Sequence, residues 1–193
     1  MPIYRDIYDG PPRSFSGAAE KRWITIHCTQ NTASARGEAG YAKRRTDGTS
    51  SHYYVDSAEL IQSLDTDLSA HHVGSRIGNR GGISYEVTGL TSWSRSRWLR
   101  SVAWDKLAAQ IVRDCAHHDI PVRLLSVAQL KAGQGGIMTH NQARLAWGGT
   151  THTDPGPNFP MDHLLERVQA DNEGGDMPSE RDIWFYRLEP EAS

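Results

Sequence analysis

Several histidines of this 193-residue chain stand where a side chain should face solvent or lie in a loop. A hydrolytic zinc site needs three protein ligands from His, Asp, Glu or Cys, and it leaves a fourth position open for water. His27, His140 and Asp154 could converge as such a set. A single histidine is more often a hydrogen-bonding residue than a ligand, so their arrangement carries this prediction. The histidines so placed are His27, His52, His71, His72, His140 and His152.

The segment around Asp154 has two interpretations. Pro155 favours an extended backbone at Asp154, which stiffens the loop and lowers the entropy lost when the carboxylate binds a metal. Asp-Pro-Gly is also common in ordinary turns. The spacing alone leaves the ligand and the turn equally well supported.

The first strong element that could position these residues is a strand over 22–29. Ile24, Ile26 and Cys28 alternate there with polar or aromatic residues, so His27 faces away from the apolar row. A helix is expected over 33–45, followed by a hairpin over 46–64 with its turn near Asp56. An irregular loop over 68–82 then leads into a strand over 82–89.

The second half of the chain predicts more helix. Apolar residues recur at helical spacing between Trp98 and His118, and Pro121 follows the end of this helix. A short strand over 121–125, a short helix over 126–133, the segment GIMTH at 136–140, a loop over 141–160 and a helix over 161–170 complete the pattern. Strands interleaved with helices predict a single α/β domain with a central, mostly mixed sheet flanked by helices.

The composition limits the class of protein. A hydrophobic fraction of 37%, a charged fraction of 23% and six tryptophans suit one globular domain. The net charge of -2 gives no support for nucleic-acid binding. Arg95, Arg97 and Arg100 are expected on a solvated helix face, with contact to an anionic wall polymer as the weaker alternative. Cys28 and Cys115 are expected to be small core residues.

Six segments, in this order, resemble the amidase type 2 family of N-acetylmuramoyl-L-alanine amidases, which is related to peptidoglycan recognition proteins. The resemblance runs from about His27 to Leu165, and its order makes it specific. The segments are WITIHCT, SSHYYVDSAELIQSL, SAHHVG, GISYEVTG, GIMTH and HTDPGPNFP.

The resemblance implies roles for individual residues. His27, His140 and Asp154 match the family's ligands for one Zn²⁺ per chain, although the inserted LAWGG leaves room for His152 as third ligand. Glu86 matches the catalytic glutamate; without the resemblance it would be interpreted as a strand-end carboxylate paired with an arginine. His152 stands where relatives often carry a lysine that stabilises negative charge, so it is expected to hold the oxyanion. His72, His52 and Trp147 are expected to line the substrate groove, and Ser51 replaces a tyrosine that some relatives carry.

The function implied by the resemblance is zinc-dependent hydrolysis of the amide bond between N-acetylmuramic acid and L-alanine in peptidoglycan. The loop from Trp147 to Pro160 is similar to lysins of phages that infect actinobacteria, which favours a phage endolysin. A non-catalytic peptidoglycan-binding module and a cytoplasmic amidase that recycles muropeptides are the alternatives.

The domain organisation predicted is an arm over 1–20, a catalytic domain over 21–172 and a tail over 173–193. The apolar segment 183–188 of this tail is expected to fold back onto the domain. No charged segment followed by an apolar run begins the sequence, so no signal peptide is predicted. We therefore expect a monomer that resides in the host cytoplasm, does not insert into membranes and reaches the cell wall after release.

Overall fold

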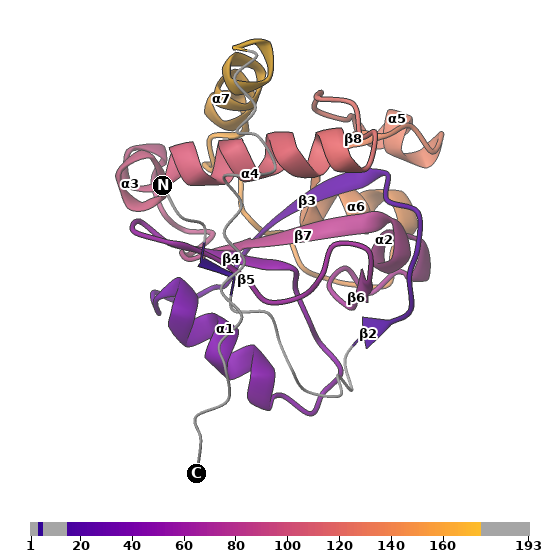
Figure 1. Cartoon of the computed structure of the whole chain (residues 1–193), viewed down its shortest axis with the longest axis horizontal. Coiled ribbons are helices and arrows are strands. Elements are labelled where there is room, and N and C mark those ends of the chain that lie inside the picture. The colour runs from indigo at the N-terminus through magenta and orange to yellow at the C-terminus, as the bar shows by residue number, and fades with distance from the viewer. Residues whose placement is uncertain (1–3, 6–14, 175–193) are drawn as a thin grey trace.

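A mixed sheet of six strands runs through the centre of the computed structural model, which describes residues 4–5 and 15–174 (Figure 1). Its strands are β1 (Tyr4–Arg5), β3 (Trp23–Cys28), β4 (Tyr53–Val55), β5 (Leu60–Gln62), β7 (Gly82–Val87) and β8 (Gly136–Thr139). Their spatial order is β1-β5-β4-β7-β3-β8. Two further strands, β2 (Phe15–Ser16) and β6 (Ser69–Ala70), pair with each other in a small second sheet.

Four neighbouring strands of the central sheet, β4, β7, β3 and β8, are parallel, and β5 returns antiparallel to β4. This arrangement confirms the predicted α/β class with a mixed central sheet. The parallel register sets His27 of β3 opposite Glu86 of β7. Because parallel strands end at the same edge of a sheet, side chains from the ends of β3, β7 and β8 meet there.

Helices cover both faces of the sheet. On one face α4 (Trp104–His117) packs over the strands, and α7 (Met161–Glu173) packs on its outer side (Figure 1). On the other face α1 (Ala35–Arg44) lies against β4 and β5, while α6 (His140–Trp147) lies against β8 and β3. The remaining helices are α2 (Arg76–Gly81), α3 (Arg95–Ser101) and α5 (Val127–Lys131).

The alternation predicted for the first strand is confirmed. Ile24, Ile26 and Cys28 join the core cluster that contains the apolar residues of α4, whereas Trp23 joins a separate cluster with Met138 on the opposite face. Cys28 and Cys115 are both buried free thiols, as expected. His27 therefore lies on the face of Trp23 and Thr25, near the carboxyl end of the strand.

The expected single helix over 98–118 is wrong. Helix α3 starts at Arg95, after Ser94, whose side chain accepts a hydrogen bond from the Arg97 N–H. Val102 is extended and buried between the two helices, and the Ala103 N–H donates to the Asp56 carbonyl instead of continuing a helix. A tertiary contact with the turn after β4 therefore overrides the continuous helical pattern.

Three other segments also differ from the sequence expectation. The predicted loop over 68–82 contains β6 and α2, and the predicted loop over 141–160 begins with α6. The predicted strand over 121–125 is reduced to an isolated bridge between Leu124 and Ile137. Helix α2 is short and rich in glycine, so its apolar period is too brief to be detected from sequence.

The two ends of the chain fall partly outside the described residues. The expected arm over 1–20 contributes β1 and β2, and the apolar segment 183–188 of the expected tail lies in the part that the structure leaves undescribed.

Arg95, Arg97 and Arg100 are exposed on α3, as expected; Arg95 pairs with Asp162 of α7. Among the described helices, none is both long and apolar enough to cross a bilayer.

Candidate metal centre and active site

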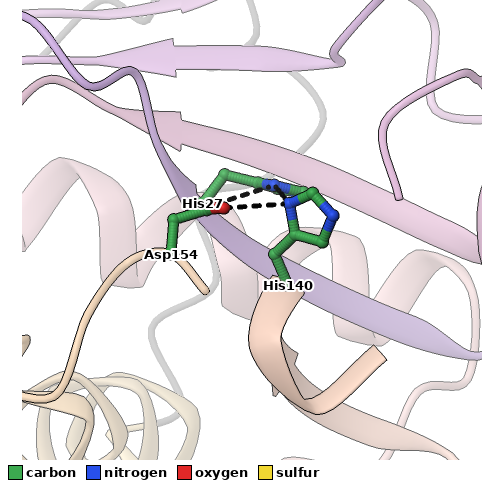
Figure 2. Close-up of side chains that lie close together, drawn as sticks. All are labelled: His27, His140 and Asp154. Carbon is green, nitrogen blue, oxygen red and sulfur yellow. Dashed lines mark hydrogen bonds and ion pairs between the residues drawn. The ribbon is translucent and has the colours of Figure 1, made fainter. Parts of the chain in front are cut away.

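Three side chains distant in sequence meet at the carboxyl edge of the parallel strands (Figure 2). His27 is the penultimate residue of β3, and His140 is the first residue of α6, directly after β8. Asp154 comes from the loop between α6 and α7. The predicted convergence of these three residues is therefore present in the structure.

The ligand atoms of this cluster face one another at short distances. His27 Nδ1 lies 3.0 Å from His140 Nδ1 and 3.2 Å from Asp154 Oδ2, and His140 Nδ1 lies 3.1 Å from Asp154 Oδ1. All three residues are buried. Two imidazole nitrogens and a carboxylate are a donor set that zinc accepts, whereas Mg²⁺ and Ca²⁺ prefer oxygen ligands alone. The donor chemistry and spacing therefore fit a zinc-type ion.

The electrostatics of the cluster favour the protonation states that a metal needs. Burial lowers the pKa of His27 below its ordinary value, so the ring is neutral at neutral pH. Burial alone would raise the pKa of Asp154, but hydrogen bonds with His140 and His27 outweigh it and hold that pKa well below the usual range. Neutral imidazole and ionised carboxylate are the metal-binding forms of these groups.

Backbone hydrogen bonds hold the loop that carries Asp154. The Cys28 N–H donates to Asp154 Oδ2 over 3.3 Å, and the Asn141 N–H donates to the Asp154 carbonyl over 3.1 Å. The carboxylate is thus tied to the end of β3, and its backbone to the start of α6. Both elements that supply a histidine also fix the aspartate.

Glu86 lies beside the cluster, in register with His27 on the neighbouring strand. Its Oε1 is 3.9 Å from His27 Nδ1, and its side chain keeps 21% of its surface exposed. Burial, followed by the negative charge of Asp154, raises the pKa of Glu86 to about 8. A partly exposed carboxyl group with a raised pKa, next to a cluster that could hold a metal, is suited to proton transfer.

His152 lies at the open side of the cluster. Its side chain is 70% exposed, its Nδ1 is 3.9 Å from Asp154 Oδ1, and its ring centroid is 5.2 Å from that of His140. Asp154 is closer than His152 to the other two members and is buried among them. The geometry therefore favours Asp154 over His152 as the third ligand and leaves His152 as an exposed neighbour of the cluster.

The three residues predicted to line a groove occupy different places. His52 has no exposed surface: its Nδ1 accepts from the Ser84 N–H over 3.0 Å, and its Nε2 donates to the Leu68 carbonyl over 3.0 Å. His72 is buried against His27. Trp147 is partly buried and packs against the Trp23 ring. This placement favours a structural role for His52 over substrate contact.

One feature that positions the site was missed in the sequence. The Thr139 side chain accepts from the Gln142 N–H, and the Gln142 side chain accepts from the Thr139 N–H. This reciprocal capping box starts α6 and places His140 at its first position. The pattern T-x-x-Q directly after a strand is its sequence signal, and it stands in the chain at 139–142.

Comparison with known families agrees with this geometry. The family profile described as N-acetylmuramoyl-L-alanine amidase matches residues 18–157, which include all three cluster residues and Glu86. The chain belongs to this amidase family. The resemblance seen in the sequence is thereby confirmed.

Individual relatives of the amidase family match parts of the chain. N-acetylmuramoyl-L-alanine amidase CwlA of Bacillus subtilis is 39% identical over 93 residues, which cover 47% of this chain and 33% of CwlA. The amidase XlyB of the same organism is 41% identical over 98 residues, covering 49% of this chain and 30% of XlyB. The matches therefore span about a third of the length of these curated relatives.

Solved structures share the fold. Staphylococcus aureus hydrolase AmiA, in complex with its ligand, superposes with a TM-score of 0.70 at 21% identity, over 89% of this chain and 83% of AmiA. PlyL superposes with a TM-score of 0.62 at 22% identity, over 90% of this chain and 99% of PlyL. The fold of this chain is thus shared with the solved structures of AmiA and PlyL.

Proposed function

We propose that this chain is a zinc-dependent N-acetylmuramoyl-L-alanine amidase, which hydrolyses the amide bond between N-acetylmuramic acid and L-alanine in peptidoglycan. The observation that carries the proposal is the buried cluster of His27, His140 and Asp154 with Glu86 beside it. Family membership supports the same reaction. A module that only binds peptidoglycan would not need a metal-type donor set and a carboxyl group poised for proton transfer.

His27, His140 and Asp154 would hold one zinc ion through their facing nitrogen and oxygen atoms. A bound zinc supplies Lewis acidity, which polarises a carbonyl group and acidifies water. Because the three residues are buried and fixed by β3, α6 and their connecting hydrogen bonds, they would bind the ion with little rearrangement. This preorganisation keeps the entropic cost of binding low.

Glu86 and His152 would carry out the proton and charge steps of amide hydrolysis. The Glu86 carboxylate takes a proton from the attacking water and later delivers it to the nitrogen of the departing L-alanine. His152, exposed at the open side of the cluster, donates a hydrogen bond to the carbonyl oxygen as negative charge develops there. The exposed edge of Trp147 would border the groove for the stem peptide and sugar.

The products of the reaction test this proposal. Purified peptidoglycan digested with the chain should release fragments with new L-alanine amino termini, detected by mass spectrometry, and a chelator should abolish the release. New reducing sugar ends would identify a glycosidase instead. Binding to peptidoglycan without any cleavage would identify a recognition module.

For the biological role we propose a phage endolysin, because the loop from Trp147 to Pro160 is similar to lysins of phages that infect actinobacteria. An endolysin should act on intact wall sacculi, whereas an enzyme for muropeptide recycling should prefer soluble anhydro-muropeptides. Comparing the two substrates at equal concentration of cleavable bonds distinguishes these roles. A strong preference for the soluble fragments would contradict the endolysin role.

A further inference from the structure

We propose that His72 is a positioning residue for His27, which holds the ring so that Nδ1 faces the metal cluster. This inference rests on the zinc site of the proposed function. It gives His72 a task different from the groove-lining role expected from the sequence. The two rings come from separate segments, β3 and the loop before α2.

The two ring nitrogens of His27 have different surroundings. Nδ1 faces His140 and Asp154, whereas Nε2 lies 2.9 Å from His72 Nδ1. The two rings meet edge to face, with centroids 5.1 Å apart and planes at 79°. Both residues are buried, with His72 only 8% exposed. His72 therefore contacts the His27 ring on the side opposite to His140 and Asp154.

With a metal on Nδ1, this contact fixes the tautomer of His27. A neutral imidazole that binds a metal through Nδ1 carries its proton on Nε2. Nδ1 of His72 is the acceptor within reach of that proton. An acceptor on the second nitrogen of a ligating histidine fixes its tautomer and orientation and raises its basicity. An apolar residue at position 72 would leave a buried N–H group of His27 without this acceptor, at a cost in free energy.

The structure also fixes His72 itself. The N–H groups of His72 and Val73 both donate to Asn79 Oδ1 over 2.9 Å, which ties this loop to α2. A Cβ atom at Gly82 would lie 2.9 Å from His72 Nε2, so the absence of a side chain there leaves room for the ring. The ring is thus held between β7 and α2 with Nδ1 toward His27.

The other nitrogen of His72 supports a role beyond packing. Nε2 is buried and has no hydrogen-bond partner among the described residues. Stability alone would favour an apolar side chain at such a position, because an unpaired buried polar group is destabilising. A histidine there is explained when its Nδ1 is needed by His27.

Replacement of His72 by Leu and by Asn tests the inference. Leu fills similar space without an acceptor, whereas the Asn Oδ1 can take the place of the imidazole Nδ1. His71→Asn is the matched control, because the adjacent His71 bonds to the Gly48 carbonyl and does not contact His27. The measurement is the zinc dissociation constant of each metal-free protein, by competition with a chromogenic chelator, together with urea unfolding of the same metal-free samples.

We expect His72→Leu to bind zinc about 10- to 100-fold more weakly than the wild type. His72→Asn should recover most of the affinity, and His71→Asn should match the wild type. Wild-type affinity in a folded His72→Leu protein would overturn the inference, as would equal losses in folded Leu and Asn variants. Should His72→Leu not fold, His72→Gln takes its place, because the Gln amide does not overlay the imidazole Nδ1. His72→Gln is then expected to bind zinc more weakly than His72→Asn. A wild-type chain that binds no zinc would instead overturn the proposed function.

Discussion

At the scale of single residues, Glu86 and His140 lie on opposite sides of His27 and have separable tasks. We expect Glu86→Gln to keep zinc at one ion per chain while the hydrolysis rate falls by about 10²- to 10⁴-fold, because the amide cannot take a proton from water. His140→Ala should lose zinc, since it removes one of three ligands. Metal analysis and amidase assays on the same samples measure both. Loss of zinc in Glu86→Gln would show that Glu86 is a ligand and not the base.

The exposed His152 has its own prediction, because the sequence left it open as a ligand. As an oxyanion donor it should be replaceable without loss of metal, so His152→Ala is expected to lower kcat by about 10²- to 10³-fold at unchanged zinc affinity. His117→Ala, a substitution of an exposed histidine on α4, is the control and should retain full activity. A large drop in zinc affinity for His152→Ala would place this ring among the ligands.

At the scale of secondary structure, the capping box of α6 links local stability to the metal site. Thr139→Ala removes the side chain that accepts from the Gln142 N–H and should cost about 1 kcal/mol of unfolding free energy. We also expect weaker zinc binding, because His140 is the first residue of this helix.

A second capping box provides the control. Ser126→Ala removes the equivalent cap of α5, where Ser126 and Gln129 make the same reciprocal bonds. It should cost a similar free energy in urea unfolding but leave the zinc dissociation constant unchanged. Equal zinc affinities in the two variants would contradict the link between the α6 cap and the site.

A buried polar network between α4 and the sheet predicts a dependence of stability on pH. Asp114 accepts hydrogen bonds from Tyr53, Tyr85 and Gln110, yet burial outweighs these bonds and raises its pKa to about 6. A raised pKa in the folded state means that the protonated form is favoured there. The stability from this group is present below about pH 4 and is lost as pH rises through about 6, a change of about 3 kcal/mol.

Asp114→Asn should remove this dependence, because the amide does not ionise. Urea unfolding between pH 4 and 8 should therefore show a smaller decline for the variant than for the wild type. Asp171→Asn, at an exposed position on α7, is the control and should follow the wild-type curve. Parallel curves for wild type and Asp114→Asn would contradict the raised pKa.

The helices and strands also show which features of the fold could be predicted from the sequence. The alternation in β3, the hairpin of β4 and β5, and the apolar face of α4 could be predicted because each pattern is local. The division between α3 and α4 could not, because it depends on Val102 entering the core and on the Ala103 N–H meeting Asp56. The cluster of His27, His140 and Asp154 could be predicted from the ligand chemistry of these residues and from the resemblance to the amidase family. The contact of His72 with His27 depends on how the loop before α2 packs against β3, for which the sequence holds no local signal.

At the scale of the whole molecule, the metal site joins segments from across the domain. In the proposed site, β3, the start of α6 and the loop before α7 would each supply one ligand, so a bound ion would connect elements more than 100 residues apart. A ligand that binds only the folded state raises the free energy of unfolding by about 2.7 kcal/mol when the free ligand concentration is 100 times the dissociation constant. We therefore expect zinc to raise the thermal midpoint and a chelator to lower it. A midpoint that does not respond to zinc in the wild type would contradict a folded-state site.

Anomalous X-ray diffraction at the zinc absorption edge, on crystals grown with added zinc, shows whether His27, His140 and Asp154 bind the ion. We expect one strong peak at about 2.0–2.2 Å from His27 Nδ1, His140 Nδ1 and an Asp154 carboxylate oxygen, with Glu86 near it but not bound. A peak at other residues, or binding through the Nε2 atoms, would contradict the account.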